Sequence, residues 1–247
     1  MVYCIKQIDI AAVTPEEEEE AVREVHLLAS FDHPHVIRYY DSFVDDEMLH
    51  IVMEYAEHGT LIDRIKQQAG VPLPEDNAWR WALHILVGLN HMHTRKILHR
   101  DLKSANIFIS ASGDAKIGDL GVSRMLATNQ KMAHTIVGTP YYLSPELCEG
   151  KPYNEKSDVW ALGCIIFEMC TDGAHPFQAS NQGALIMKIL SESCSTVPKR
   201  YSEGLRDTVA ACLTKDPKDR PDTWQMFNNA NVQERALSLG VELPGRP

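Results

Sequence analysis

The segment HRDLKSAN, residues 99–106, decides how the rest of the chain is interpreted. It contains a carboxylate, Asp101, followed by Lys103 and Asn106, and a second carboxylate, Asp119 of a DLG triplet, comes thirteen residues after that asparagine. Each of these patterns alone is weak evidence of function, but their occurrence together in this order is strong evidence. Phosphoryl transfer needs a carboxylate near the acceptor hydroxyl, a cation on the phosphates and oxygen ligands for Mg²⁺. The segment therefore predicts a phosphotransferase site.

The bulk composition excludes several other classes of protein. The 247 residues can bury a sizeable core, and 44% apolar with 23% charged residues is typical of a globular protein. The formal net charge of −10 argues against nucleic acid or an anionic membrane as a partner. The longest apolar stretch, residues 159–167, is too short to span a bilayer, and no secretory signal is visible.

The cysteines and histidines carry little further signal. Six cysteines are scattered without a C-x-x-C pair, which argues against a disulfide framework or a zinc site and favours reduced thiols in a cytoplasmic protein. The alternate pairs His33/His35 and His91/His93 have a spacing that a metal could use. The first pair flanks a proline in an expected turn and the second closes an expected helix, so we do not predict a metal there.

Hydrophobic periodicity predicts a small strand-rich unit followed by a mainly helical one. The junction between them is expected at residues 54–59. Strands are expected at 1–10, 35–44 and 48–56, with a turn at Asp45–Glu47, and two shorter strands flank a turn at Ser112–Gly113. Helices are expected at 14–31, from Pro74 onward, and at 157–170, 182–192, 202–214 and 222–230.

With these motifs in place, nearly the whole chain resembles a protein kinase. The resemblance implies that Asp101 orients and deprotonates the acceptor hydroxyl, and that Lys103 contacts the transferred phosphate. It also implies that Asn106 and Asp119 hold Mg²⁺, with ATP as the phosphate donor. A second class, small-molecule kinases of the aminoglycoside type, shares an Asp-x-x-x-x-Asn loop. That class lacks the segments IVGTPYYLSPE and SDVWALGC found here.

Those two segments extend the resemblance to the scaffold. IVGTPYYLSPE, residues 136–146, resembles the end of an activation segment, and its last residue, Glu146, is expected to form an ion pair with Arg220. SDVWALGC, residues 157–164, resembles the buried central helix of the family, in which Asp158 would brace the catalytic loop.

The lysine of the first strand has two possible explanations. On its own, Lys6 would be an edge-strand charge that discourages aggregation. By the resemblance, YCIK at residues 3–6 corresponds to the Val-Ala-Ile-Lys strand of kinases, so Lys6 would hold the α- and β-phosphates and pair with Glu24 on the following helix. The motifs further along the chain favour the functional explanation.

The same resemblance places an adenine pocket. Met53 would be the gatekeeper, the backbones of Glu54 and Ala56 would hydrogen-bond the purine, Phe108 would form the floor and Cys4 part of the roof. Met53 and Phe108 could equally be ordinary core residues. Both a pocket role and core packing would bury these two side chains, so the sequence does not distinguish the two roles.

The implied fold class is α+β, a bilobal protein kinase fold across 1–247. It divides into a partial N-lobe at 1–54, a helical C-lobe at 55–232 and a C-terminal tail at 233–247. Only five residues precede Lys6, so the first two strands and the G-x-G-x-x-G turn of a kinase are missing from this sequence. We therefore expect an N-terminally truncated chain that binds Mg·ATP weakly.

Within the family the sequence resembles the serine/threonine kinases, on the basis of Lys103 and Thr139, and among these the NimA-related (NEK) family. The segments HPHVIRYYDSF, IVMEYAEHGTL and the stretch from Ile136 to Cys164 carry that likeness, which is strongest to the branch with β-propeller repeats behind the kinase domain. Leu120 replaces the usual Phe of Asp-Phe-Gly, a variant that also occurs in this family.

The expected activity is ATP- and Mg²⁺-dependent phosphorylation of serine or threonine in protein substrates. The alternative is a pseudokinase or scaffold that keeps the fold but binds ATP poorly, although a binding module would be free to lose the polar set retained here. Thr135, four residues before Thr139, is the expected activating phosphosite, modified by an upstream kinase or by autophosphorylation. Family resemblance suggests a cytoplasmic location with cytoskeletal or ciliary association.

Overall fold

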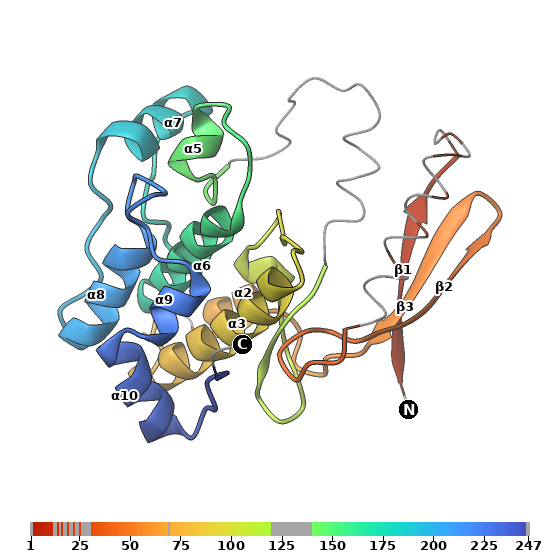
Figure 1. Cartoon of the computed structure of the whole chain (residues 1–247), viewed down its shortest axis with the longest axis horizontal. Helices are drawn as coiled ribbons and strands as arrows, with labels where there is room; N and C mark the ends of the chain where they lie inside the picture. The colour runs from red at the N-terminus through yellow and green to blue at the C-terminus, as the bar shows by residue number, and fades with distance from the viewer. Residues whose placement is uncertain are drawn as a thin grey trace.

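The computed structural model describes residues 2–11, 31–68, 70–119 and 140–245, together with residues 14, 16, 19, 22 and 25. These residues form two lobes (Figure 1). A small antiparallel sheet containing the N-terminus lies at one side, and the helices gather at the other. The predicted α+β bilobal fold is confirmed.

The sheet of the N-lobe contains three strands in the order β1-β3-β2. They are β1 (Tyr3–Asp9), β2 (Tyr39–Asp45) and β3 (Met48–Glu54). The predicted hairpin is confirmed: β2 and β3 are joined by Asp46 and Glu47, both with positive φ (45° and 59°), which suits a two-residue turn between twisted strands.

The strand β1 pairs with β3 so that Lys6 lies opposite Ile51. Alternation along β1 places successive side chains on opposite faces of the sheet. Lys6 and Ile8 are half-buried, whereas Ile5 and Gln7 are exposed. The lysine therefore points to the inner face of the sheet, toward the second lobe.

The strand predicted at 35–44 begins later than expected, at Tyr39. The residues before it bond to a different partner. Ile37 N donates to Ile117 O at 2.8 Å, and Ile117 N donates to His35 O at 2.9 Å. The chain here is extended because it runs beside the C-lobe hairpin rather than because it belongs to the N-lobe sheet.

The C-lobe is built around two long helices, α3 (Glu75–Thr94) and α6 (Glu155–Cys170). Every residue of α6 from Ser157 to Cys170 is buried, as its nearly continuous apolar sequence predicts. The helix α3 contacts α6, β5 (Ala115–Ile117), α9 (Thr223–Phe227) and α10 (Ala230–Leu239), so it is buried over most of its circumference rather than on one face. Gly163 allows α8 (Glu203–Cys212) to approach closely, because a Cβ there would lie 2.6 Å from Cys212 Cβ.

The remaining elements surround these helices. They are α2 (Leu61–Gln67), η1 (Ser104–Asn106), β4 (Ile107–Ile109), β5 (Ala115–Ile117), α5 (Pro145–Cys148), α7 (Gln182–Ser191) and α8 (Glu203–Cys212). The two short strands pair around the predicted turn. None of the helices in the described ranges is long and apolar enough to cross a membrane.

The helix predicted at 222–230 is instead two helices, α9 (Thr223–Phe227) and α10 (Ala230–Leu239). Asn229 causes the break, because its side chain accepts a hydrogen bond from Asn231 N and starts the second helix. Val232 and Ala236 of α10 are buried, and the helix contacts α3 and α8. Much of the region expected to be a tail is thus a packed helix.

Candidate active site

The segment 99–106 folds into a compact loop that ends in η1. Lys103 Nζ donates to Asp101 Oδ2 at 2.7 Å. Asn106 Nδ2 donates to Asp101 O at 2.8 Å and to Asp101 Oδ2 at 3.1 Å. The Asp101 side chain is about one-third exposed, so the carboxylate is oriented by its neighbours and still open to a substrate.

His99 connects this loop to the segment carrying Asp119. Its Nδ1 accepts from Asp101 N at 3.2 Å, so its Nε2 carries the proton and donates to Gly118 O at 3.1 Å. Complete burial lowers the pKa of His99 despite the nearby carboxylates, which keeps the ring neutral in this tautomer.

Asp158, at the start of α6, braces the loop as the resemblance implies. One carboxylate oxygen accepts from His99 N at 3.1 Å and from His93 Nε2 at 2.8 Å. The other accepts from Arg100 N at 3.3 Å and from the Tyr153 hydroxyl. Burial alone would raise the pKa of Asp158, but the hydrogen bond and electrostatic attraction of His93 and the hydrogen bond from Tyr153 outweigh it and hold the pKa below its usual value. The backbone at Arg100, with φ of 65°, is thereby held in the left-handed region.

Lys6 of β1 reaches across the space between the lobes and forms an ion pair with Asp119. The two residues are 113 positions apart, and both side chains are partly exposed. The structure thus brings the predicted phosphate-binding lysine to the predicted metal-binding carboxylate. Glu24, the other expected partner of Lys6, lies outside the described residues.

A pocket of about 520 Å³ lies beside this pair. The residues predicted to hold adenine all line it: Cys4, Met53, Glu54, Ala56 and Phe108. Gly118 permits the arrangement, because a Cβ at that position would lie 2.7 Å from the Phe108 ring. Ile37, Tyr55, Glu57 and Gly59 also line the pocket and were not predicted. Tyr55 and Glu57 adjoin predicted pocket residues in the sequence, whereas only the fold brings Ile37 to this pocket.

The residues present fit a magnesium ion. The Asn106 amide nitrogen donates to Asp101, which turns the amide oxygen the other way. Amide and carboxylate oxygens from Asn106 and Asp119 are donors that Mg²⁺ prefers. Within the described ranges no group of three or more His, Cys, Asp or Glu side chains could by itself hold a metal ion, so a site here depends also on water and phosphate oxygens.

The end of the expected activation segment is firmly anchored. Glu146 accepts two hydrogen bonds from Arg220, at 2.8 and 2.9 Å, and a third from Ser157 Oγ at 2.7 Å. Burial acts to raise the pKa of Glu146, but the guanidinium and the hydroxyl hold it below its ordinary value. The predicted Glu146–Arg220 ion pair is confirmed. Thr135, Thr139 and Leu120 lie outside the described residues.

One polar cluster beside the site was not predicted. Tyr142 accepts a hydrogen bond from Ser104 N at 3.3 Å, and its hydroxyl lies 3.0 Å from Ser104 Oγ. Burial and the carboxylate of Glu168 raise the pKa of Tyr142. His175 Nδ1 lies 2.7 Å from Glu168 Oε1, and its ring stacks on Tyr141. The buried Glu168 in an otherwise apolar helix was the only signal that the sequence offered for this cluster.

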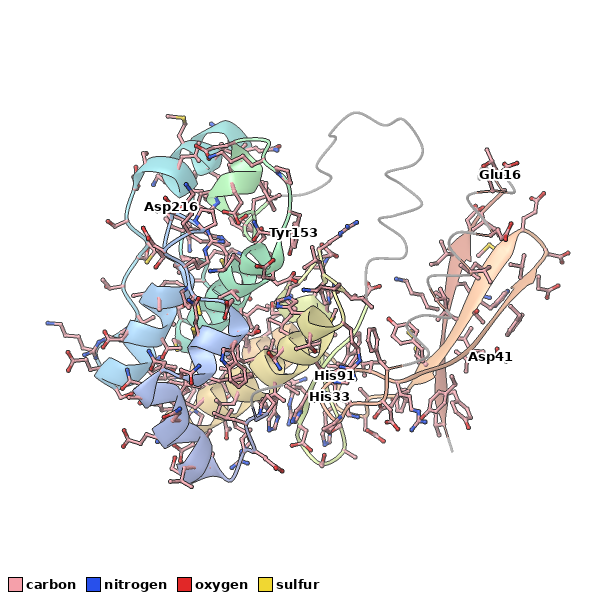
Figure 2. The ribbon with its side chains drawn as sticks, viewed as in Figure 1. Glu16, His33, Asp41, His91, Tyr153 and Asp216 are labelled. Atoms are coloured by element: carbon pink, nitrogen blue, oxygen red, sulfur yellow. The ribbon has the colours of Figure 1, made fainter. Side chains whose placement is uncertain are left out.

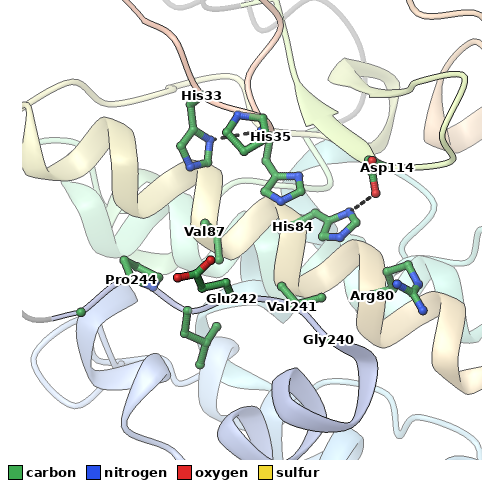
Figure 3. A pocket seen from close by; sticks show the side chains of 13 residues that line it. His33, His35, Arg80, His84, Val87, Asp114, Gly240, Val241, Glu242 and Pro244 are labelled. Atoms are coloured by element: carbon green, nitrogen blue, oxygen red, sulfur yellow. Dashed lines mark hydrogen bonds and ion pairs between the residues drawn. The ribbon is translucent and has the colours of Figure 1, made fainter.

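A second pocket, of about 480 Å³, lies between α3 and residues 240–245 (Figure 3). His33, His35 and His84 line it, and His35 and His84 stack at 4.0 Å. His33 also lies 4.4 Å from the ring of His91 (Figure 2). Neither histidine pair singled out in the sequence forms a metal cluster among the described residues.

Comparison with known proteins agrees with this geometry. The family profile described as "Protein kinase domain" matches residues 1–231. The chain belongs to the protein kinase family. This kinase domain is 43% identical over 233 residues to mouse serine/threonine-protein kinase Nek1, covering 94% of this chain and 19% of Nek1.

Other relatives are also Nek serine/threonine kinases. Human Nek5 is 42% identical over 218 residues (88% of this chain, 31% of Nek5), and zebrafish Nek8 is 42% identical over 240 residues (97% of this chain, 34% of Nek8). The predicted NEK resemblance is confirmed. The kinase domain described here spans only about a fifth to a third of these relatives.

Proposed function

We propose that this chain transfers the γ-phosphoryl group of Mg·ATP to a serine or threonine hydroxyl of a protein substrate. The observation that carries the proposal is the array in which Lys103 and Asn106 both hydrogen-bond the Asp101 carboxylate. Hydrogen bonds of His99 link this array to Gly118, which is next to Asp119, and both members of the Lys6–Asp119 pair line the adjoining pocket. A general base, phosphate-binding cations and metal ligands are thus retained together.

Each residue has a defined task in this proposal. Asp101 accepts the proton of the acceptor hydroxyl, and Lys103 stabilises charge on the transferred phosphoryl group. Lys6 contacts the α- and β-phosphates, and the backbones of Glu54 and Ala56 meet the purine. Asn106 and Asp119 would hold the Mg²⁺ that neutralises phosphate charge and orients the γ-phosphate.

The orientation of Asp101 is what the protein itself contributes to the chemical step. His99 and Asp158 hold the backbone on either side of Arg100, and Asn106 and Lys103 hold the carboxylate. Because the base is fixed before a substrate arrives, little reorganisation remains for the reaction.

The proposal is tested by measuring transfer of ³²P from [γ-³²P]ATP with Mg²⁺ onto casein, with Asp101→Asn as the matched control. Binding of Mg·ATP is measured in parallel by calorimetry. Transfer by the wild-type chain that disappears in the variant supports the kinase. Binding without any transfer to casein or to itself would favour a pseudokinase, and absence of both would refute the proposal.

A further inference from the structure

An ion pair joins the two lobes at Glu54, one of the residues that line the proposed nucleotide pocket. Lys116 Nζ of β5 lies 2.7 Å from Glu54 Oε1 at the end of β3. The two side chains are only 15% and 25% exposed, so the pair is partly shielded from water and more than a surface contact. Nothing in the proposed chemistry uses Lys116.

Glu54 is held by more than this lysine. Its second carboxylate oxygen, Oε2, accepts from Arg38 N at 3.2 Å, while Glu54 N donates to Arg38 O at 2.8 Å. The carboxylate thus bridges the backbone at Arg38 on one side and the ammonium of Lys116 on the other. Glu54 also lines the pocket. Holding its carboxylate in place therefore also restrains the orientation of its backbone beside the pocket.

Lys116 belongs to the hairpin that forms the other wall of the site. It lies directly opposite Phe108 in the β4–β5 register, and it precedes Gly118 and Asp119 by two and three residues. The same hairpin holds the far end of the connecting segment, since His58 N donates to Ile109 O at 3.0 Å and Ile109 N donates to Gly59 O at 2.9 Å.

The segment 54–59 is therefore tied to one hairpin at both ends. At residues 58 and 59 backbone hydrogen bonds connect the segment to the β4–β5 hairpin. At Glu54 the connection is the ion pair with the Lys116 side chain. Loss of the lysine would leave Glu54 without a direct bond to the hairpin, held only by its pairing with β1 and by the backbone at Arg38. Residues 54–56, which would meet the purine, lie at this end of the segment.

We propose that Lys116 is a positioning residue for nucleotide binding. By fixing the Glu54 carboxylate, it sets the direction in which the backbone of 54–56 faces the pocket. The inference rests on the proposed function for the identity of the ligand, an adenine nucleotide, but the ordering of the segment is a property of the nucleotide-free chain.

The test compares Lys116→Met with Lys116→Arg, which restores a cation. The matched control is Lys151→Met, which removes a lysine from an exposed ion pair with Glu149. Hydrogen–deuterium exchange of the 54–59 amides is measured without nucleotide, and Kd for Mg·ATP, KM and kcat are measured in parallel.

In Lys116→Met we expect faster exchange at 54–59, a Kd and a KM raised about five- to tenfold, and a kcat at saturating ATP within about twofold of wild type. Lys116→Arg should recover most of the affinity, and Lys151→Met should match wild type. Unchanged exchange or unchanged Kd in Lys116→Met would overturn the inference, as would a fall in kcat at constant KM.

The two proposals fail in different ways. If the wild-type chain binds no nucleotide, both the proposed function and the nucleotide-binding part of this inference are refuted. If the wild-type chain binds nucleotide, and Lys116→Met shows the same amide exchange at 54–59 and the same Kd, only this inference is refuted.

Discussion

Arg220 and Glu146 lie 74 residues apart and are joined by two parallel hydrogen bonds, with neither side chain more than 2% exposed. The other guanidinium N–H groups donate to the backbone oxygens of Lys156, Thr214 and Lys215. All five donors of the arginine are thus matched, and the ring of Trp160 lies 5.0 Å from its central carbon. This pair connects the end of the activation segment to the loop before α9.

Replacing Arg220 with methionine should destabilise the fold strongly. The variant leaves the Glu146 carboxylate buried without its cation, and breaking a buried pair in this way costs about 3–5 kcal/mol. Urea unfolding followed by circular dichroism measures the loss. Lys151→Met, which breaks an exposed pair, serves as the control and should unfold like wild type. A loss in Arg220→Met no larger than in that control would contradict the prediction.

Replacing Asp101 with asparagine should separate chemistry from binding. The variant keeps the size and the hydrogen-bonding partners of the side chain but removes the proton acceptor, so transfer should fall on the order of 10²–10⁴-fold. The Kd for Mg·ATP should stay close to wild type, because Asp101 does not line the nucleotide pocket. The assay is single-turnover ³²P transfer beside calorimetry. Wild-type turnover in Asp101→Asn would disprove the assignment of the base.

The histidine cluster predicts a loss of stability in mild acid. Burial lowers the pKa of His33 and of His84 to about 4, with help from neighbouring imidazoles, and burial also lowers the pKa of His35 and His91. Between pH 6.5 and about 4 the unfolded chain therefore binds more protons than the folded one, so stability falls as the pH falls through this window.

His84→Gln tests this pH dependence directly. Glutamine can still accept from Ala115 N, the bond that His84 Nδ1 makes at 3.2 Å, but it does not titrate. Wild type should lose about 1–2 kcal/mol through His84 between pH 7 and pH 5, and the variant should lose correspondingly less. Denaturant unfolding at several pH values gives the slopes. Parallel slopes for both proteins would show that His84 is not one of the groups responsible. The other charged groups around the cluster, Arg80, Asp114 and Glu242, are retained in both proteins.

Thr135→Ala should lower activity if phosphate on this residue orders the activation segment. Phosphate adds nearly two negative charges and can form charge-assisted hydrogen bonds to an arginine such as Arg100 beside the base. Mass spectrometry of active protein should find Thr135 modified, and Thr135→Ala should lose most of the transfer rate. Ser123→Ala is the comparison variant within the same segment. An unmodified Thr135 in fully active protein would refute this assignment.

Much of the site could be predicted because its residues occupy fixed positions in short segments. Asp101, Lys103 and Asn106 lie in one short loop, so their spacing in the sequence already brings them together, and the kinase resemblance of residues 3–6 indicated that Lys6 faces the site. Asn229 shows where such reasoning fails. The helical periodicity continues across 222–230, and one side-chain hydrogen bond to Asn231 N decides that the helix restarts there.

The contacts that the sequence could not predict are those between single residues far apart in the chain. Nothing in the spacing of Lys116 and Glu54 marks them as partners, since each is an ordinary charged residue on a short strand. The stack of His35 on His84 likewise depends on how the chain before β2 crosses α3. Such pairs are set by packing geometry, which local patterns do not contain.

The support of Asp101, the proposed general base, has a consequence for kinetics. The groups that orient Asp101 are His99, Lys103, Asn106 and, through the backbone, Asp158, and all of them belong to the helical lobe. Lys6, which would meet the nucleotide, comes from the sheet of the other lobe. Among the described residues, the contacts that orient Asp101 are all made without nucleotide, so under the proposed function we expect initial-rate kinetics in which either substrate can be added first.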